Sequence, residues 1–296
     1  TGIYMRRAQA LLFPLLIVFL LFDAAAAIAS DFSGESALEF TKKVVYFGPR
    51  PPTSAANKNL QAYILAQMKL HGCQIIEDPF TAKTPKGPMP MRNLICKFPG
   101  KTGKAIVFTG HFDTKLFPGR KFVGANDGGS STGLLLEMVR ALSKKPRKDD
   151  VYLVFYDGEE AIGEWSPTDG IHGSRHLAER WKQEGVAGRI KALVNVDMIG
   201  DKDLGVLQEM NSTPGLRRLV WKIAADLGYS KYFLDSENAI EDDHMPFLKI
   251  GVPALDLIDF DFPAWHTDGD TIDKVSARSL MVVGDVLMEL LRRIEG

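Results

Sequence analysis

Cysteine is scarce in this chain of 296 residues, which contains only Cys73 and Cys96. A secreted scaffold held together by several disulfides is therefore excluded, and so is a zinc site built from paired cysteines. Each cysteine lies in a short run typical of a strand, so one cross-strand disulfide is a possibility. Two buried free thiols are the other possibility, because sequence spacing does not fix the distance between the two Cα atoms.

The chain also lacks an excess of charge of either sign. Lys and Arg total 36, while Asp and Glu total 37, which gives a formal net charge of −1. A protein that binds nucleic acid through its phosphates normally carries a clear basic surplus. The charge balance therefore argues against a nucleic-acid partner.

Long apolar runs are missing from most of the sequence, but the first thirty residues contain one. Arg6 and Arg7 precede the apolar segment 11–22, and the small residues Ala27 and Ala29 follow it. A basic region, an apolar stretch of about a dozen residues and a small-x-small motif are together typical of a secretory signal peptide.

We therefore expect residues 1–29 to be a signal peptide that is cleaved after Ala29, leaving one catalytic domain at 30–296. Such a protein would be exported, to the periplasm or outside the cell, without stable membrane association after cleavage. An uncleaved N-terminal anchor is the alternative. Pro14 and Asp23 argue against it, because they interrupt the ~20 apolar residues that a membrane-spanning helix needs.

No internal repeat or low-complexity linker divides residues 30–296, which is consistent with one domain. Apolar residues at spacings of three and four predict helices at 36–45, 57–70, 131–142, 174–184, 214–227 and 277–294. Short β-rich runs lie between them, at 73–76, 93–98, 105–109, 151–156, 190–196 and 252–258. The alternation predicts an α/β fold with a central, twisted, mixed but mostly parallel β-sheet that helices cover on both faces.

Four of the predicted strands lead into histidine or carboxylate side chains. These are His111 and Asp113 after 105–109, Glu159 and Glu160 after 151–156, Asp197 after 190–196, and His266 beyond 252–258. A single Asp after a strand is often only a helix cap or a turn former. Four such ends together predict a site at the carboxyl ends of the strands, where open α/β sheets bind their ligands.

The candidate groups are imidazoles and carboxylates, without a thiolate. They are His111, Asp113, Asp127, Glu159, Glu160, Asp197, Asp242, Asp243, His244 and His266. Such side chains suit a catalytic zinc ion, which takes three protein ligands and keeps a fourth position for water or substrate. Because adjacent residues cannot face one ion equally well, one of Glu159 and Glu160 could bind metal while the other moves protons. A solvated acidic turn is the plainer alternative for this pair.

The segments that carry these groups resemble the zinc-dependent aminopeptidases. Within that superfamily they are most similar to the glutaminyl-peptide cyclotransferases, acyltransferases that form N-terminal pyroglutamate. The most specific matches are the segment 157–178, the Asp-Asp-His run at 242–244 and the Trp-His-Thr run at 265–267. The similarity extends over residues 35–293.

This resemblance implies one catalytic zinc ion, with the ligands Asp127, Glu160 and His266. It implies that Glu159 is the proton shuttle, and that Asp197 and Asp242 are the catalytic carboxylates beside it. A second zinc site, containing His111 and Asp197, would be expected if the protein were instead a two-zinc aminopeptidase.

The resemblance also implies a set of substrate-binding residues, Trp165, Trp265, Glu241 and Phe262. Glu241 stands where the animal enzymes of the family carry Gln, so its effect on substrate preference is open. The expected substrates are peptides or proteins with a free N-terminal Gln, with N-terminal Glu as a further alternative. The expected enzyme is a monomer.

The alternative function is a two-zinc exopeptidase that hydrolyses N-terminal residues. A zinc-bearing protein without catalytic activity is disfavoured, because a binding protein needs no proton carrier such as Glu159.

Overall fold

The computed structural model describes residue 2 and residues 31–296, except residue 144. The predicted signal peptide therefore lies outside the described residues, apart from residue 2. Within the described part of the chain, no helix has both the length and the apolar character needed to cross a membrane.

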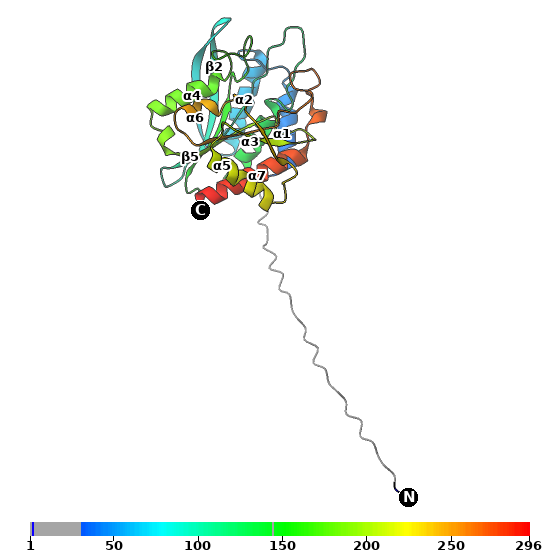
Figure 1. The fold of residues 1–296 in the computed structure, drawn as a ribbon. Helices are drawn as coiled ribbons and strands as arrows, with labels where there is room; N and C mark the ends of the chain where they lie inside the picture. The colour runs from blue at the N-terminus through cyan, green and yellow to red at the C-terminus, as the bar shows by residue number, and fades with distance from the viewer. Residues whose placement is uncertain (1, 3–30, 144) are drawn as a thin grey trace.

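A six-stranded sheet forms the centre of the molecule, with the strand order β1-β2-β4-β3-β5-β8 (Figure 1). Its strands are β1 (Gln74–Thr84), β2 (Gly87–Phe98), β3 (Ala105–His111), β4 (Asp150–Tyr156), β5 (Ile190–Asp197) and β8 (Ala254–Ile258). β3 pairs in parallel with β4 and β5, and β5 pairs in parallel with β8. The β1–β2 and β2–β4 pairs are antiparallel. The predicted mixed, mostly parallel sheet is therefore confirmed.

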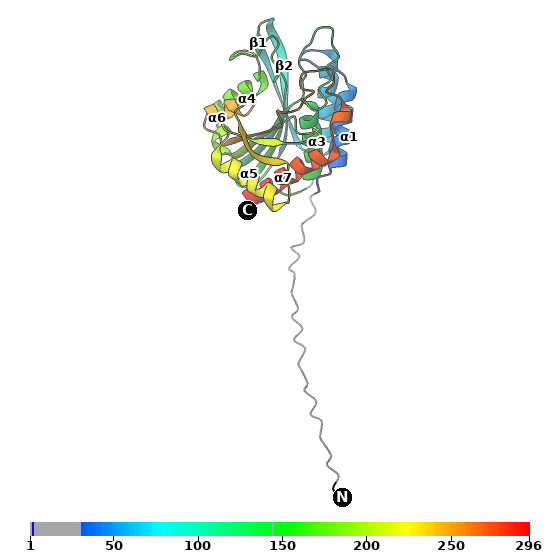
Figure 2. The same ribbon diagram turned by 45° about the vertical axis from the view of Figure 1, so that its right-hand side comes forward.

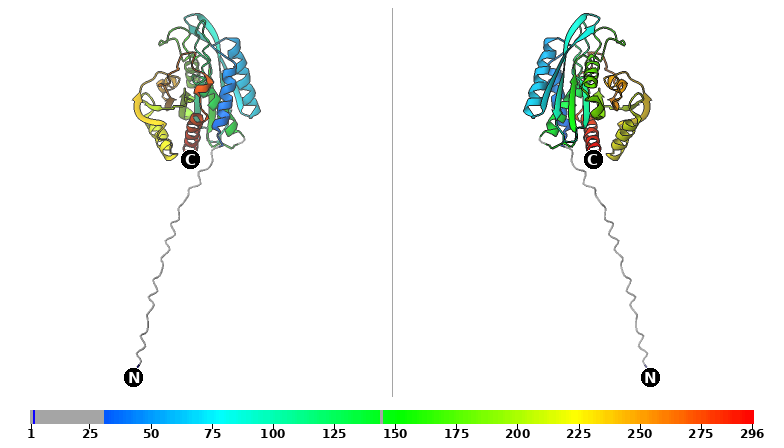
Figure 3. Two further views of the ribbon diagram at one scale, coloured as in Figure 1. Left: turned by 90° about the vertical axis from the view of Figure 1, so that its right-hand side faces the viewer. Right: turned by 90° about the vertical axis from the view of Figure 1, so that its left-hand side faces the viewer.

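Helices cover both faces of the sheet. Successive strand residues point to opposite sides, so apolar residues of one strand pack against helices on both faces. Ile106 and Phe108 of β3 pack in a core with α1 (Gly34–Tyr46), α2 (Ala55–Leu70), α3 (Gly129–Leu142) and α7 (Ala277–Glu295). Ala105 and Val107 pack in a second core with α4 (His172–Gln183) and α6 (Met245–Lys249). Figure 2 shows the sheet between these helices, and Figure 3 shows α1 and α2, in blue, on the opposite side of the molecule from α6, in orange.

The β1–β2 hairpin is much longer than the predicted strands. Its outer part contains Pro79, Pro88 and Pro90, which disfavour a strand because proline cannot donate a backbone hydrogen bond. These prolines are tolerated because β4 pairs only with the inner part of β2, so the outer hairpin is edge strand on both sides. The hairpin extends beyond the helices at the top of Figure 2.

Two strands, β6 (Val206–Glu209) and β7 (Phe233–Asn238), and one α-helix, α6, are absent from the prediction. The two strands form a separate parallel pair, and α5 (Pro214–Asp226), which was predicted, lies between them in the sequence. β7 was missed because most of its side chains are polar and exposed. The helix α6 was missed because its five residues are too few to show a helical period.

Cys73 and Cys96 form a disulfide, and their Cα atoms lie 5.6 Å apart. Cys73 immediately precedes β1 and Cys96 lies within β2, so the bond ties the base of the hairpin together. Of the two states that the sequence left open, the structure has the cross-linked one.

Candidate active site

The candidate side chains meet at one edge of the sheet. β3 ends at His111, β5 ends at Asp197, and Glu159 and Glu160 follow the end of β4. Since these strands are parallel, their carboxyl ends lie at the same edge. His266 reaches the site on the loop after β8.

A cavity of about 550 Å³ opens at this edge. Most of the predicted site residues line it, namely Asp127, Glu159, Glu160, Trp165, Asp197, Glu241, Asp242, Trp265 and His266. Lys115, Phe117, Ile240 and Phe260 are among the other lining residues. His111 lies beneath the cavity, with 1% of its surface exposed.

Phe262 lies elsewhere, although the resemblance assigned it to substrate binding. It is buried, packs in a small apolar cluster with Met198 and Ile258, and lines a separate cavity of about 420 Å³. The sequence match places Phe262 in the correct loop, but only the path of the backbone decides which side of that loop its ring faces. Among the described residues, Phe262 is therefore not one of those that line the cavity containing Glu159.

Asp127, Glu160 and His266 form a compact group that could hold a metal ion. His266 Nε2 lies 3.3 Å from Asp127 Oδ2 and 3.2 Å from Glu160 Oε1. Asp127 Oδ2 is buried and makes no hydrogen bond within the described part of the chain. Two carboxylates and one imidazole converging in this way fit the donor set of a catalytic zinc site.

The contacts among these three side chains change their pKa values. Burial would lower the pKa of His266, but its contacts with Asp127 and Glu160 raise it to about 9. Burial and the charge of Asp127 raise the pKa of Glu160 to about 7. Burial opposes ionisation of Asp127, yet its contacts with His111 and His266 outweigh burial and hold its pKa below the usual range. A divalent cation would relieve the repulsion between the two carboxylates.

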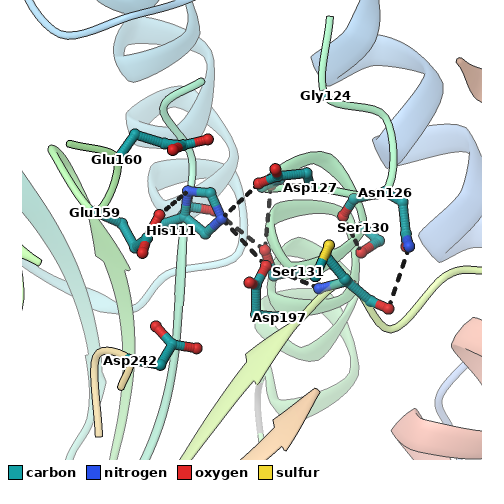
Figure 4. A network of polar contacts seen from close by, with 12 residues as sticks. His111, Gly124, Asn126, Asp127, Ser130, Ser131, Glu159, Glu160, Asp197 and Asp242 are labelled. Atoms are coloured by element: carbon teal, nitrogen blue, oxygen red, sulfur yellow. Dashed lines mark hydrogen bonds and ion pairs between the residues drawn. The ribbon is translucent and has the colours of Figure 1, made fainter. Parts of the chain in front are cut away.

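His111, Asp127 and Asp197 form a second group of possible metal ligands. His111 Nε2 lies 3.2 Å from Asp197 Oδ1 and 3.3 Å from Asp127 Oδ1. Figure 4 shows His111 between these two carboxylates on one side and Glu159 on the other, where its Nδ1 is 3.8 Å from Glu159 Oε2. Asp127 is shared, so the two groups adjoin.

Glu159 belongs to neither ligand group among the described residues. It is 8% exposed and lines the cavity beside Glu160. Burial raises its pKa well above the usual range; the charge of His111 opposes this shift, and the charges of Glu160 and Asp242 add to it. The environment of Glu159 thus favours its protonated form, the form in which a carboxyl group acts as a general acid.

Asp113 fixes the turn that carries Glu159 and Glu160. Its two carboxylate oxygens accept hydrogen bonds from the backbone N–H groups of Glu159, at 3.1 Å, and of Glu160, at 3.3 Å. The side chain is completely buried, so it acts from behind the site. The sequence named Asp113 as a candidate ligand, whereas the structure gives it a supporting position.

Two buried residues that the sequence did not single out hold the turn before α3. Asp270 accepts hydrogen bonds from the backbone N–H groups of Asn126, at 2.7 Å, and of Asp127, at 3.0 Å. Arg50 donates to the carbonyl oxygens of Phe112, at 2.7 Å, and of Gly124, at 2.8 Å. Neither residue lies in a recognisable motif, and both are distant in sequence from the residues they hold.

Gly128 allows this turn to approach His111. Its φ is +71°, and a Cβ atom at this position would lie 2.9 Å from His111 Cε1. Any other residue would therefore be both strained and too close to the imidazole ring.

Two tryptophans stand at the cavity mouth. Trp165 is 43% and Trp265 is 40% exposed, which is unusual for such large side chains and typical of a ligand-binding surface. The Trp265 ring stacks on His266 with centroids 4.2 Å apart. Phe117 and Phe122 contact the same imidazole edge to face, so three aromatic rings fix its orientation.

Two other histidines of the matched segments, His244 and His176, have structural partners. His244 is fully buried, and its Nε2 lies 3.1 Å from Glu209 Oε2. His176 Nε2 lies 3.0 Å from Asp78 Oδ1. Neither belongs to a possible metal group in the described residues.

Comparison with known proteins identifies the class first. Residues 93–291 match peptidase family M28, so the chain belongs to that family and has its α/β fold. A Zn-dependent exopeptidase from Parabacteroides distasonis is one structural relative, with 26% identity and a TM-score of 0.78 over 88% of this chain and 98% of that chain.

More similar proteins define the branch of the family. The glutaminyl-peptide cyclotransferase of Drosophila melanogaster is 30% identical over 265 residues, which is 79% of this chain and 75% of that protein. The glutaminyl cyclase of an Acidobacteriales bacterium shares 40% identity, with a TM-score of 0.85 over 98% of this chain and 99% of that chain. The chain belongs to the glutaminyl-peptide cyclotransferases, and the resemblance drawn from its sequence is confirmed.

Proposed function

We propose that this chain converts the N-terminal glutamine of peptides or proteins into pyroglutamate and releases ammonia. Its membership of the cyclotransferase family supports this activity. The observation that carries the proposal is the position of Glu159, a buried carboxyl group in the cavity beside a possible metal site but not part of it. Ring closure needs such a proton carrier and no protein nucleophile.

One zinc ion held by Asp127, Glu160 and His266 is the proposed cofactor. The convergence of these donors, and an Asp127 Oδ2 atom that is buried without a hydrogen bond, support this assignment. Zinc in such a site supplies Lewis-acid polarisation of a carbonyl group.

In the reaction, the α-amine of the substrate attacks the γ-carbonyl carbon of the same glutamine. The new C–N bond closes the five-membered ring, and the bond from that carbon to the amide nitrogen breaks. Glu159 takes a proton from the attacking amine and returns one to the departing nitrogen, so ammonia leaves and the carboxylate is regenerated. Asp197 and Asp242 line the same cavity, and the charge of Asp242 raises the pKa of Glu159, which favours the protonated form that donates to the departing nitrogen.

The walls of the cavity are proposed to hold the glutamine side chain. Trp165 and Trp265 supply flat apolar surface, and the exposed Glu241 lines the same cavity. Enclosure of a short side chain brings its amine close to its own carbonyl carbon, which supplies the orientation that ring closure needs. Peptides with N-terminal Glu should be tested beside those with Gln.

A two-zinc exopeptidase is the second candidate function. The group of His111, Asp127 and Asp197 favours it, because it supplies ligands for another ion next to the first. The fold is shared with a Zn-dependent exopeptidase. The two exposed tryptophans favour the cyclase, since they narrow the cavity around one short side chain.

The deciding experiment offers the purified protein Gln-aminoacyl and Leu-aminoacyl fluorogenic substrates and measures zinc per chain by elemental analysis. We expect pyroglutamate from the first substrate, detected by mass spectrometry, and one zinc per chain. Release of leucine with two zinc ions per chain and no pyroglutamate would favour the exopeptidase instead.

We propose in addition that the protein is exported after cleavage behind Ala29 and acts as a monomer. The basic, apolar and small-residue segments of 1–29 support export. Intact mass of the protein recovered from the exported fraction should correspond to a chain that begins at Ser30, and light scattering should give the mass of one chain.

A further inference from the structure

Glu209, the last residue of β6, is fully buried and saturated with hydrogen bonds. Its carboxylate accepts from the backbone N–H groups of Asn211 (2.9 Å), Ser212 (2.7 Å) and Ile240 (3.2 Å). It also accepts from Asn211 Nδ2 (2.9 Å) and Ser212 Oγ (2.7 Å), and His244 Nε2 lies 3.1 Å away. None of these partners is a proposed zinc ligand, and the proposed reaction does not use Glu209.

Two of these contacts fix both ends of the segment 240–244. The Ile240 N–H is held at one end and the His244 side chain at the other. Between them lie Glu241 and Asp242, and Ile240, Glu241 and Asp242 all line the cavity. One buried carboxylate thus sets the path of a cavity wall.

Buried side chains also lie between His244 and Asp242. His244 Nδ1 lies 3.9 Å from Asp256 Oδ2, which is too far for a hydrogen bond. Asp256 Oδ1 accepts a hydrogen bond from Asn195 Nδ2 at 3.1 Å, and the same amide donates to Asp242 Oδ2 at 3.0 Å. All of these side chains are buried. His244 and the amide of Asn195 that donates to Asp242 therefore lie on either side of the same carboxylate, that of Asp256.

We propose that Glu209 is a positioning residue for the active site, which holds the segment 240–244 and thereby the orientation of Asp242 and the Ile240 wall. This inference rests on the proposed function for its kinetic readout. Loss of the Glu209 contacts with Ile240 and His244 should impair substrate binding and turnover. Zinc content should not change, because the proposed ligands Asp127, Glu160 and His266 are held by other residues.

The main test is the variant E209Q, which keeps the size of the side chain but places an amide NH₂ group against backbone and side-chain donors. For Gln-peptide cyclisation, well below the melting temperature, we expect KM to rise and kcat to fall. The combined loss in kcat/KM should be about tenfold or more, with zinc per chain unchanged. A merely structural role would lower the melting temperature and leave both constants at the wild-type value, which would overturn the proposal.

Glu137 offers a matched control. It is also fully buried and accepts hydrogen bonds from the Ser33 N–H, at 2.8 Å, and from Arg140, but it lies on α3 outside the cavity. E137Q should therefore reduce stability without changing KM or kcat. Equal kinetic losses in E137Q and E209Q would show a general effect of destabilisation and contradict the positioning role.

Two further measurements keep the proposal testable if E209Q fails to fold or the substrate is different. H244Q removes the imidazole that contacts Glu209 at one end of the segment and lies beside Asp256. We expect a smaller change of KM and kcat in the same direction, and wild-type constants would contradict the proposal. Hydrogen–deuterium exchange needs no substrate. Amides of 239–244 should exchange faster in E209Q or H244Q than in E137Q, and unchanged exchange there would overturn the inference. Absence of cyclisation by the wild type would instead refute the proposed function.

Discussion

Asp270 holds the backbone N–H group of Asp127 and leaves the Asp127 carboxylate available to other groups. Asp270 Oδ2 accepts the Asp127 N–H at 3.0 Å, while the Asp127 side chain faces His111 and His266. Burial and the charge of Asp127 raise the pKa of Asp270 to about 7, and hydrogen bonds from the Asn126 and Asp127 backbone oppose this shift. Asp270 is therefore a support for the proposed zinc ligand rather than a ligand itself.

Replacement of Asp270 by Ala should weaken zinc binding by about 10- to 100-fold, the usual effect of losing a residue that supports a metal ligand. The reason is that two buried N–H groups lose their acceptor and the Asp127 turn becomes free to move. Competition with a chelator measures the affinity. D285A is the control, because Asp285 accepts a hydrogen bond from Tyr229 outside the site. Equal affinities of D270A and D285A would refute the supporting role.

Replacement of Glu159 by Gln should lower kcat by about 100-fold or more, since the amide cannot carry the proton. Zinc per chain should stay at the wild-type value, because Glu159 is not one of the proposed ligands. Steady-state kinetics and elemental analysis on the same sample provide the measurement. If E159Q kept its turnover, another group would have to be the proton carrier. E179Q, at an exposed residue of α4, is the control for effects of mutation and purification that do not involve the site.

The two tryptophans should differ in their effects. W165A should raise KM by about three- to tenfold, the range expected for loss of one aromatic contact, without changing zinc affinity. W265A should raise KM and also weaken zinc binding, because Trp265 stacks on the His266 ring. Kinetics and chelator competition on both variants test this. Equal zinc affinities of W165A and W265A would show that the stacking does not hold His266.

Acid should remove the contribution of Glu209 to stability. Burial opposes its ionisation, but hydrogen bonds with His244 and Ser212 outweigh burial and lower its pKa from the ordinary 4.5 to about 2. Because the folded pKa is the lower one, the stabilisation is complete above pH 4.5 and is lost as the pH falls through about 2. The difference in unfolding free energy between wild type and E209Q, measured with urea from pH 6 to 3, should therefore shrink below pH 4.5. A difference that grew towards pH 3 would contradict this.

Removal of the disulfide should lower stability by about 3 kcal/mol, given the 23-residue separation of Cys73 and Cys96. The double variant C73S/C96S should unfold at lower urea concentration, and wild type with a reductant should behave in the same way. Its kcat and KM should stay unchanged, because the bond lies at the base of the hairpin and not at the cavity. Loss of activity in a folded double variant would show that the hairpin base influences the site.

Much of the site was predictable because its residues follow strands in short, distinctive runs. Three such runs can be recognised from neighbouring residues alone: a strand ending in His111, a Glu159-Glu160 pair after another strand, and a Trp265-His266 pair after a third. Periodicity predicted the large helices and the central strands, and their alternation predicted the α/β class. Weak elements were missed, since the polar β7 and the five-residue α6 carry little periodic signal.

The sequence by itself determined the family, the class of fold and the chemical types that meet at the sheet edge, because those depend on local patterns. Tertiary structure decided that Cys73 and Cys96 are joined and that Phe262 lines a different cavity from Glu159. It also decided that Asp270 and Glu209 hold the active-site turns. Such relationships join residues far apart in the chain through the direction of side chains and backbone N–H groups, and only the packed fold sets those directions.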